Sequence, residues 1–249
     1  MSGPIDASDA EISEQRHNYE MVMEAHLNSD VQTTCSTDMR ERFPACHQLG
    51  TMWCWATAVA AATEYYTNRT GARCVGLECD IVGWTFSQVC CPFTGTEGDK
   101  DACGDRGAGW EKIQKALNHF TGQSWQRPKG PLDKATLDAT LQSGNPVIIE
   151  VGPDVHPNHV VTVHGCDGGG KYWFHDPEFI NDPTNPKSSY YEEYFLVDYS
   201  WLLEMCYVWV RDASAGGQKL IACTRGSPKA SNEIFRIESR WWDTLYVPP

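Results

Sequence analysis

A thiol, an imidazole and a carboxylate occur along this sequence at places where the expected local structure would let them act together. Cys54 comes at the start of an alanine-rich segment, and we expect it at the N-terminus of a helix. The free N–H groups and the dipole of a helix N-terminus stabilise a thiolate. Gln48 lies six residues earlier, and its amide, with the backbone N–H of Cys54, would bind the oxygen of a tetrahedral intermediate. Cys54 is therefore the candidate nucleophile and Gln48 the candidate oxyanion donor.

The candidate base and its orienting acid lie in the second half of the chain. His159 heads a β-branched run, and Asp176 ends an aromatic run that follows a glycine-rich turn at residues 167–170. A base at the head of one strand can hydrogen-bond to an acid at the end of its hairpin partner, and this contact orients the imidazole. We predict that His159 is the general base and that Asp176 orients it. Trp53, which precedes Cys54, and Asn158, which precedes His159, are candidate substrate-binding residues.

Other histidines and tryptophans near these positions have simpler explanations. His164 and His175 lie farther along the same strands, and we expect structural or surface roles for them, with His156 a loop neighbour of the site. Trp55 is expected to pack in the core. A single buried cysteine is more often packing than chemistry, but the four candidate residues occur together in an order that favours catalysis.

The segment around the candidate nucleophile resembles the papain-like cysteine peptidases. Gln48 is followed by five residues and then by Cys54, Trp55 and Ala56, which is similar to the Gln, five residues, Cys-Trp-Ala segment of that superfamily. His159 and Asp176 are similar to its second catalytic segment, where Asn or Asp occupies the second position. The resemblance implies an acyl-thioenzyme formed on Cys54.

A further stretch indicates the branch of that superfamily. Residues 141–151 are similar to the segment before the catalytic histidine in double-glycine-type bacteriocin-processing peptidases, staphopains and related plant-pathogen effector proteases. The resemblance implies a compact member of the superfamily rather than a relative of the lysosomal cathepsins. It covers residues 48–66 and 137–177 and nothing after residue 178.

The first function that this pattern predicts is a thiol peptidase that cleaves peptide or amide bonds. A deamidase or acyl transferase would use the same residues with another acceptor, and a non-catalytic, disulfide-rich binding module on the same fold is a third reading. Intact Gln48, Cys54, His159 and Asp176 argue against the third. The product distinguishes the enzymatic functions: a peptidase yields a hydrolysed backbone, a deamidase yields ammonia, and a transferase yields a new amide.

The elements that must position these residues predict an α+β fold, in which a helical half carrying Cys54 packs on a twisted antiparallel sheet carrying His159 and Asp176. We expect an acidic tail or lead-in element at residues 1–34 and a catalytic domain at residues 35–249. Its helical, cysteine-rich half would span residues 35–131 and its mainly β half residues 132–249.

Periodicity and turn signals place the individual elements. Helices are predicted at residues 14–26, 51–66, 110–120 and 132–141, with a short one near 85–91. Strands are predicted at residues 147–151, 159–163, 171–174, 190–199, 207–210, 220–223 and 241–247.

The charge balance of the chain limits the classes of partner that it can bind. The 249 residues include 20 basic and 33 acidic side chains, for a formal net charge of -13. This charge repels phosphate backbones, so we expect a peptide or protein substrate and no nucleic acid. No run approaches the roughly 18 to 20 apolar residues that a membrane helix needs. We expect no membrane insertion and a monomer.

The chain has eleven cysteines, and five of them lie between Cys74 and Cys103. An odd count is what five disulfides and one free thiol would give, and a nucleophile must be free. The cysteine count favours secretion or another oxidising compartment, although no secretion signal is visible in this chain. The absence of a Cys-x2-Cys pair argues against structural zinc, and we expect no metal and no cofactor.

Overall fold

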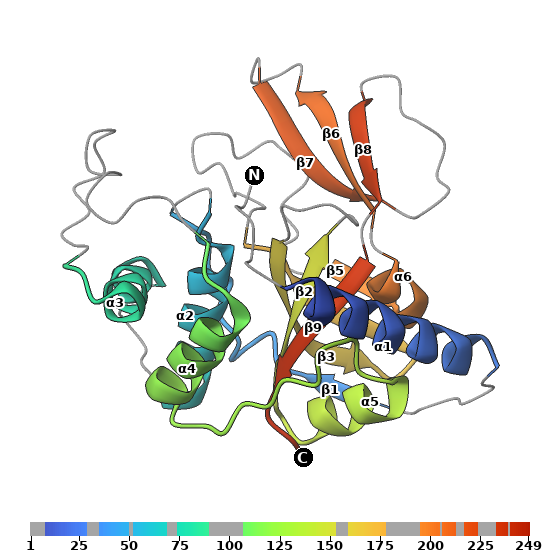
Figure 1. Ribbon diagram of the computed structural model, residues 1–249, viewed down its shortest axis with the longest axis horizontal. Coiled ribbons are helices and arrows are strands. Elements are labelled where there is room, and N and C mark those ends of the chain that lie inside the picture. The colour runs from blue at the N-terminus through green and yellow to red at the C-terminus, as the bar shows by residue number, and fades with distance from the viewer. Residues whose placement is uncertain are drawn as a thin grey trace.

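The computed structural model describes residues 8–28, 35–49, 52–68, 74–89, 107–152, 159–177, 195–204, 206–212, 217–223, 233–238 and 240–249. Helices dominate the first half and antiparallel strands the second, so the predicted α+β class is confirmed (Figure 1). The helices are α1 (Asp9–Leu27), α2 (Cys54–Thr67), α3 (Cys74–Phe86), α4 (Trp110–Thr121), α5 (Lys134–Gln142) and α6 (Tyr199–Leu203). The strands are β1 (Ser36–Asp38), β2 (Val147–Gly152), β3 (His159–Asp167), β4 (Lys171–His175), β5 (Phe195–Asp198), β6 (Cys206–Asp212), β7 (Gly217–Cys223), β8 (Glu233–Glu238) and β9 (Arg240–Tyr246).

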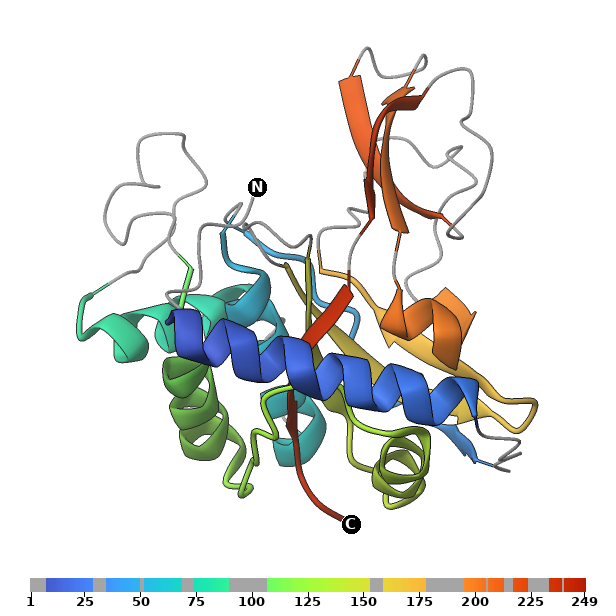
Figure 2. The same ribbon diagram turned by 45° about the vertical axis from the view of Figure 1, so that its right-hand side comes forward.

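The central sheet has the order β5-β4-β3-β2-β9, and every pair in it is antiparallel. β1 pairs with the far end of β3, beyond the residues that pair with β2. All six residues of β2 are buried, because helices cover both faces of the sheet. Figure 2 shows α1 lying across one face, while α2 packs against β3.

Gly165 permits the close approach of β1 to β3. A Cβ atom at Gly165 would lie 2.5 Å from the carbonyl oxygen of Thr37, a separation that real side chains do not show. The disulfide between Cys35 and Cys166 then ties the two strands together. This end of β3 is thus fixed by both backbone pairing and a covalent bond.

Helix α2 is the buried centre of the helical half. It is rich in alanine, the residue with the highest helix propensity, and eleven of its side chains are buried, from Cys54 to Tyr65. Small side chains let α3, α4 and β3 pack closely around it. The packing fixes the direction in which the N-terminus of α2 points.

Helix α4 shows why one helix of this half was easy to predict. Its buried residues Trp110, Ile113, Ala116 and Leu117 recur at three- and four-residue spacing and form one apolar stripe. Gly122 ends the helix in the left-handed conformation, with φ of 69°.

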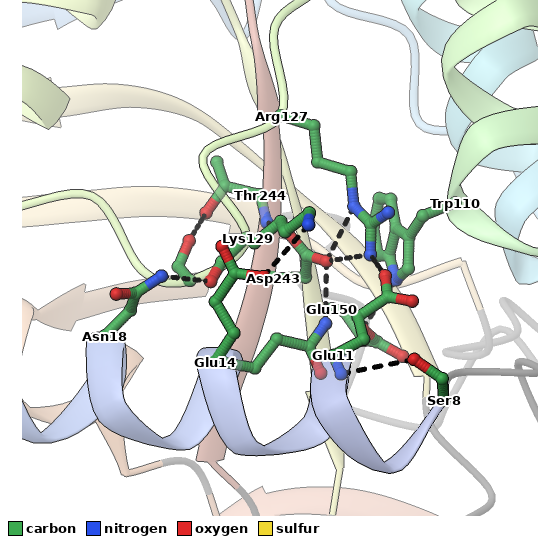
Figure 3. A network of polar contacts seen from close by, with 12 residues as sticks. Ser8, Glu11, Glu14, Asn18, Trp110, Arg127, Lys129, Glu150, Asp243 and Thr244 are labelled. Atoms are coloured by element: carbon green, nitrogen blue, oxygen red, sulfur yellow. Dashed lines mark hydrogen bonds and ion pairs between the residues drawn. The ribbon is translucent and has the colours of Figure 1, made fainter.

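Helix α1 belongs to the folded body, within the segment predicted to be an acidic tail or lead-in. Figure 3 shows the polar contacts that attach it to the sheet. Gln15 donates to Asp243 of β9 at 2.8 Å, and Glu11 pairs with Arg127. The side chain of Asn18 donates to the carbonyl of Lys129 at 2.8 Å. At least one acidic residue of this segment, Glu11, is therefore held in an ion pair with the rest of the fold.

A second sheet, in the order β7-β6-β8, is inserted between α6 and β9. Both views place it beyond the end of the central sheet at which β9 begins (Figures 1 and 2). In its register, Cys206 lies opposite Cys223.

Two expectations about individual elements need correction, and two strands were missed. The helix expected near residues 85–91 lies earlier, at α3, where Leu77, Ile81 and Val82 form a buried face that outweighs the glycines and cysteines of this segment. The strand expected at residues 190–199 is described from Phe195 and gives way to α6 at Tyr199, because the Asp198 side chain caps that helix. β1 and β8 were not predicted.

The expectation of disulfides is confirmed, and the structure supplies two pairings that the sequence left open, Cys35–Cys166 and Cys46–Cys74, with Cα–Cα distances of 5.7 and 5.6 Å. Cys79 is also disulfide-bonded. Within the described part of the chain, Cys54 is a free cysteine. The total of five bridges stays a prediction.

Among the described helices, none has the length and apolar character that crossing a membrane requires.

Candidate active site

Cys54 is the first residue of α2 and is buried, with 3% of its surface exposed. Trp53 is the N-cap residue and provides no side-chain cap, and no acidic residue occupies the first turn. The first N–H groups of a helix have no partner within it, so this end of α2 can stabilise an anion. The position suits a thiolate.

His159 is the first residue of β3, and Asp176 follows the last residue of β4. The antiparallel pairing of the two strands brings the start of one beside the end of the other. Nε2 of His159 lies 2.6 Å from Oδ1 of Asp176, whose side chain is fully buried. The structure therefore brings together the imidazole and the carboxylate that the hairpin pattern suggested.

His159 also interacts with Cys54 at the junction of α2 and β3. Burial acts to lower the pKa of His159, but the charge and hydrogen bond of Asp176, together with a hydrogen bond to Cys54, outweigh it. The pKa of His159 is therefore raised well above its ordinary value of 6.5. Since Asp176 occupies Nε2, the other ring nitrogen is the one available to the thiol. An imidazole with this environment favours its protonated form beside a thiolate.

Gln48 lies in a loop that is tied to the same region. Its backbone N–H donates to the carbonyl of Pro177 at 3.1 Å, one residue beyond Asp176. Two residues before it, Cys46 is bonded to Cys74 at the start of α3. The loop that carries the candidate oxyanion donor is thus attached both to the strand that ends at the candidate acid and to the helical half.

The two tryptophans beside Cys54 are both buried. Trp53 is 5% exposed, and Trp55 is 2% exposed and makes an edge contact with Phe86 at 6.1 Å between ring centroids. Trp55 therefore packs in the core. Asn158 and His156 lie outside the described residues.

His164 and His175 are in the interior. The ring of His164 stacks on Phe43 with 5.0 Å between centroids. Burial lowers the pKa of His164 to about 3, with a further contribution from His175, and burial lowers the pKa of His175 to about 4. Both imidazoles are therefore neutral near pH 7, which fits a structural role.

In the part of the chain that the structure describes, no three His, Cys, Asp or Glu side chains form a group able to hold a metal ion. Cys74 and Cys79, two of the five clustered cysteines, are disulfide-bonded. The remaining three, Cys90, Cys91 and Cys103, lie outside the described residues.

Glu78 is a buried residue beside this region that the sequence analysis missed. It lies on α3, is fully buried, and accepts a hydrogen bond from the backbone N–H of Leu49. The available signal was a carboxylate flanked by Leu77 and Cys79, in line with the apolar face of the helix, whereas the neighbouring Asp80 is exposed.

A thiol at a helix N-terminus, an imidazole and a buried carboxylate, connected in that order, form the arrangement typical of cysteine hydrolases. The model of the Peptidase_C39-like family matches residues 40–202, more than half of the chain, and the chain therefore belongs to this family. The match spans all four candidate residues and indicates a peptidase of the cysteine type. A comparison with curated proteins finds no match.

Proposed function

We propose that this protein is a papain-like cysteine peptidase in which Cys54 is the nucleophile, His159 the general base and Asp176 the residue that orients the histidine. The observation that supports it most strongly is the 2.6 Å contact between His159 and a fully buried Asp176. An interaction with Cys54 also contributes to the raised pKa of the same imidazole. Membership of the Peptidase_C39-like family supports the same reaction class.

In the first half of the proposed reaction, the thiol proton of Cys54 moves to His159, and the thiolate attacks the carbonyl carbon of the substrate. The carbonyl oxygen becomes an oxyanion, which the Gln48 amide and the Cys54 N–H stabilise. Protonated His159 then gives its proton to the leaving amine, the carbon–nitrogen bond breaks, and a thioester remains on Cys54.

In the second half, His159 takes a proton from water as the water oxygen attacks the thioester. A second oxyanion forms at the same donors and collapses, and the carbon–sulfur bond breaks. The acid product leaves, and the proton held by His159 returns to the sulfur of Cys54. The raised pKa of His159 favours the imidazolium–thiolate pair that opens the first half, and it makes the neutral imidazole a stronger base toward water in the second half.

The substrate class follows from the same proposal. We expect peptide or protein substrates, with Trp53 and Asn158 as substrate-binding residues, and a catalytic domain that spans residues 35–249. The segment at residues 141–151 supports placement in the compact branch that includes double-glycine-type peptidases, staphopains and effector proteases. We retain the expectation of a monomer. The bridges Cys35–Cys166 and Cys46–Cys74 support the expectation of an oxidising compartment.

The test is to incubate the protein with a peptide library prepared from a whole-cell digest and to map new peptide termini by mass spectrometry. The expected result is new N-termini that are absent with Cys54→Ala and with His159→Ala. Release of ammonia from glutamine-containing peptides, without new termini, would instead indicate a deamidase. Transfer of a labelled amine onto the peptides would indicate a transferase.

A peptidyl epoxide, which alkylates the nucleophile of cysteine peptidases, provides a test that needs no knowledge of the preferred substrate. Mass mapping should find the adduct on Cys54, and His159→Ala should lose it. An adduct on another cysteine, or none on Cys54, would overturn the proposal.

A further inference from the structure

Glu78 is a buried carboxyl group next to the proposed site that the reaction above does not use. None of its surface is exposed, and it lies on α3, one helical turn after Cys74. A buried carboxyl group in an apolar helix is costly, so its contacts indicate what it does there.

Its contacts lead to both parts of the proposed oxyanion site. Oε2 of Glu78 accepts from the backbone N–H of Leu49 at 3.1 Å, and Leu49 directly follows Gln48. The Thr57 hydroxyl, which donates to the carbonyl of Trp53 at 3.0 Å, also interacts with the carboxyl group and lowers its pKa. The carboxyl group thus lies between the Gln48 loop and the first turn of α2.

Two further contacts attach the described part of the loop, and neither one involves Leu49. Cys46 is held by its disulfide to Cys74, and the N–H of Gln48 is held by Pro177. These bonds secure the start of the loop and the backbone at Gln48 itself. The bond to Glu78 secures the residue that follows, and it limits rotation of the peptide unit between Gln48 and Leu49.

We propose that Glu78 is a positioning residue for the oxyanion site, which holds the Leu49 N–H and so keeps the Gln48 side chain directed toward the tetrahedral intermediate. This inference rests on the proposed function and adds a residue to it. Glu78 acts through the loop and does not touch the substrate.

The charge state of Glu78 affects this role. Burial raises its pKa to about 8, opposed by the hydrogen bond from the Leu49 N–H and by the interaction with the Thr57 hydroxyl. Neither of these groups is charged, and in the described part of the chain no charged residue contributes to the shift. Glu78 is therefore a neutral acid at pH 7. Its ionisation above pH 8 would place a buried negative charge beside donors that must bind an oxyanion, which weakens them.

Two probes separate this effect from the reactivity of the thiolate. Iodoacetamide alkylates Cys54 by displacement: a carbon–sulfur bond forms, iodide leaves, and no oxyanion arises. p-Nitrophenyl acetate acylates Cys54 through a tetrahedral oxyanion that expels p-nitrophenolate. Because both rates depend on the same thiolate, the ratio of acylation to alkylation reports on the oxyanion site alone. Rates with Cys54→Ala are subtracted as background.

Two variants test the role. Glu78→Met keeps the length and burial of the side chain but removes the acceptor, and we expect the ratio to fall about tenfold, since loss of a complete oxyanion donor costs roughly 100-fold or more. Glu78→Gln keeps an acceptor for the Leu49 N–H and should restore the ratio to within about twofold. In the wild-type protein the ratio should fall above about pH 8, and in Glu78→Gln it should stay level from pH 6 to 9.

Glu64→Gln is the matched control. Glu64 is a half-buried carboxylate on α2, ten residues beyond Cys54 and so about 15 Å along the helix, and its pKa is also raised by burial. This variant should leave the ratio and its pH dependence unchanged.

A wild-type ratio in Glu78→Met, or a fall above pH 8 that persists in Glu78→Gln, would overturn the inference while leaving the proposed function intact. Failure of wild-type Cys54 to react with iodoacetamide would overturn the proposed function and this inference with it.

Discussion

Buried charge is arranged differently on the two sides of the central sheet. Under α1, the carboxylate of Asp243 is fully buried and accepts from Arg127 at 2.6 Å and from Gln15 at 2.8 Å, while the backbone of Thr244 donates to its other oxygen (Figure 3). At the junction of α2 and β3, the fully buried carboxylate of Asp176 pairs with His159.

The difference lies in what the partners can do. An arginine stays protonated at any pH of interest, and the amide and backbone donors do not titrate. Imidazole and thiol groups exchange protons near neutral pH, so the second arrangement can change its charge during a reaction. Burial of a carboxylate alone therefore does not mark a catalytic site, whereas a buried carboxylate paired with a titratable side chain does.

The largest expected effect is on stability, and it should follow from breaking the polar network under α1. Arg127→Met removes the charged partner of a buried carboxylate, and we expect a loss of about 3 to 5 kcal/mol in the free energy of unfolding. Denaturant unfolding measures this loss, and Cys54 alkylation should be unchanged under native conditions. The control is Lys129→Met, which breaks only the exposed pair with Glu14 and should not change stability measurably. A matching loss of alkylation would show that the two regions are coupled.

The buried carboxyl group of Glu78 should affect stability in a pH-dependent way. In the unfolded chain a glutamate releases its proton near pH 4.5, whereas the folded state holds it until about pH 8. Between these values only the folded state binds the proton, so stability falls as pH rises. Relative to wild type, Glu78→Gln should therefore gain about 1.4 kcal/mol per pH unit over this window. Unfolding midpoints at pH 5, 6.5 and 8 check this, and an equal difference at all three would contradict it.

The neutral buried histidines should have the opposite pH dependence. The unfolded chain protonates them near pH 6.5, and the folded state resists until about pH 3 for His164 and about pH 4 for His175. Stability is thus lost as pH falls below 6.5. His164→Phe keeps an aromatic ring against Phe43 and should lose less stability between pH 6.5 and 4. Parallel acid-unfolding curves for the two proteins would show that His164 is not one of the groups responsible.

The smallest expected effect is a change in the alkylation rate of Cys54 when the charge of Asp176 is removed. Asp176→Asn keeps a hydrogen-bond acceptor for His159 but removes the negative charge that raises its pKa. A fall of about one pKa unit would lower the alkylation rate of Cys54 at pH 6 by about tenfold. The matched variant is Asp243→Asn, which alters the carboxylate of the other region and should not change that rate. An unaltered rate in Asp176→Asn would mean that the carboxylate only fixes the ring.

The parts of the fold that local chemistry dictates could be predicted from the sequence. The alanine-rich run of α2, the apolar stripe of α4 and the β-branched run of β2 specify their own conformations. Such signals also placed Cys54 at a helix start and His159 at a strand start. The contact between His159 and Asp176 follows from antiparallel pairing around a glycine-rich turn.

The contacts that depend on distant parts of the chain could not be predicted. The bridge between Cys35 and Cys166 spans 131 residues, and nothing in the spacing of eleven cysteines selects it. Burial of Glu78 depends on how α3 packs against α2, which periodicity does not reveal. The attachment of α1 was missed for the same reason, since its acidic residues resemble a solvated segment until Arg127 and Asp243 are brought to them.

The central claim is that His159 maintains Cys54 as a thiolate, and the pH dependence of iodoacetamide alkylation of Cys54 tests it most directly. Only about 0.3% of an ordinary thiol is ionised at pH 6. We predict that wild-type Cys54 reacts at pH 6 at more than about a tenth of its rate at pH 9, and that His159→Ala reduces the pH 6 rate about a hundredfold. A wild-type rate that rises only near pH 8.5, or one that His159→Ala leaves unchanged, would contradict the account.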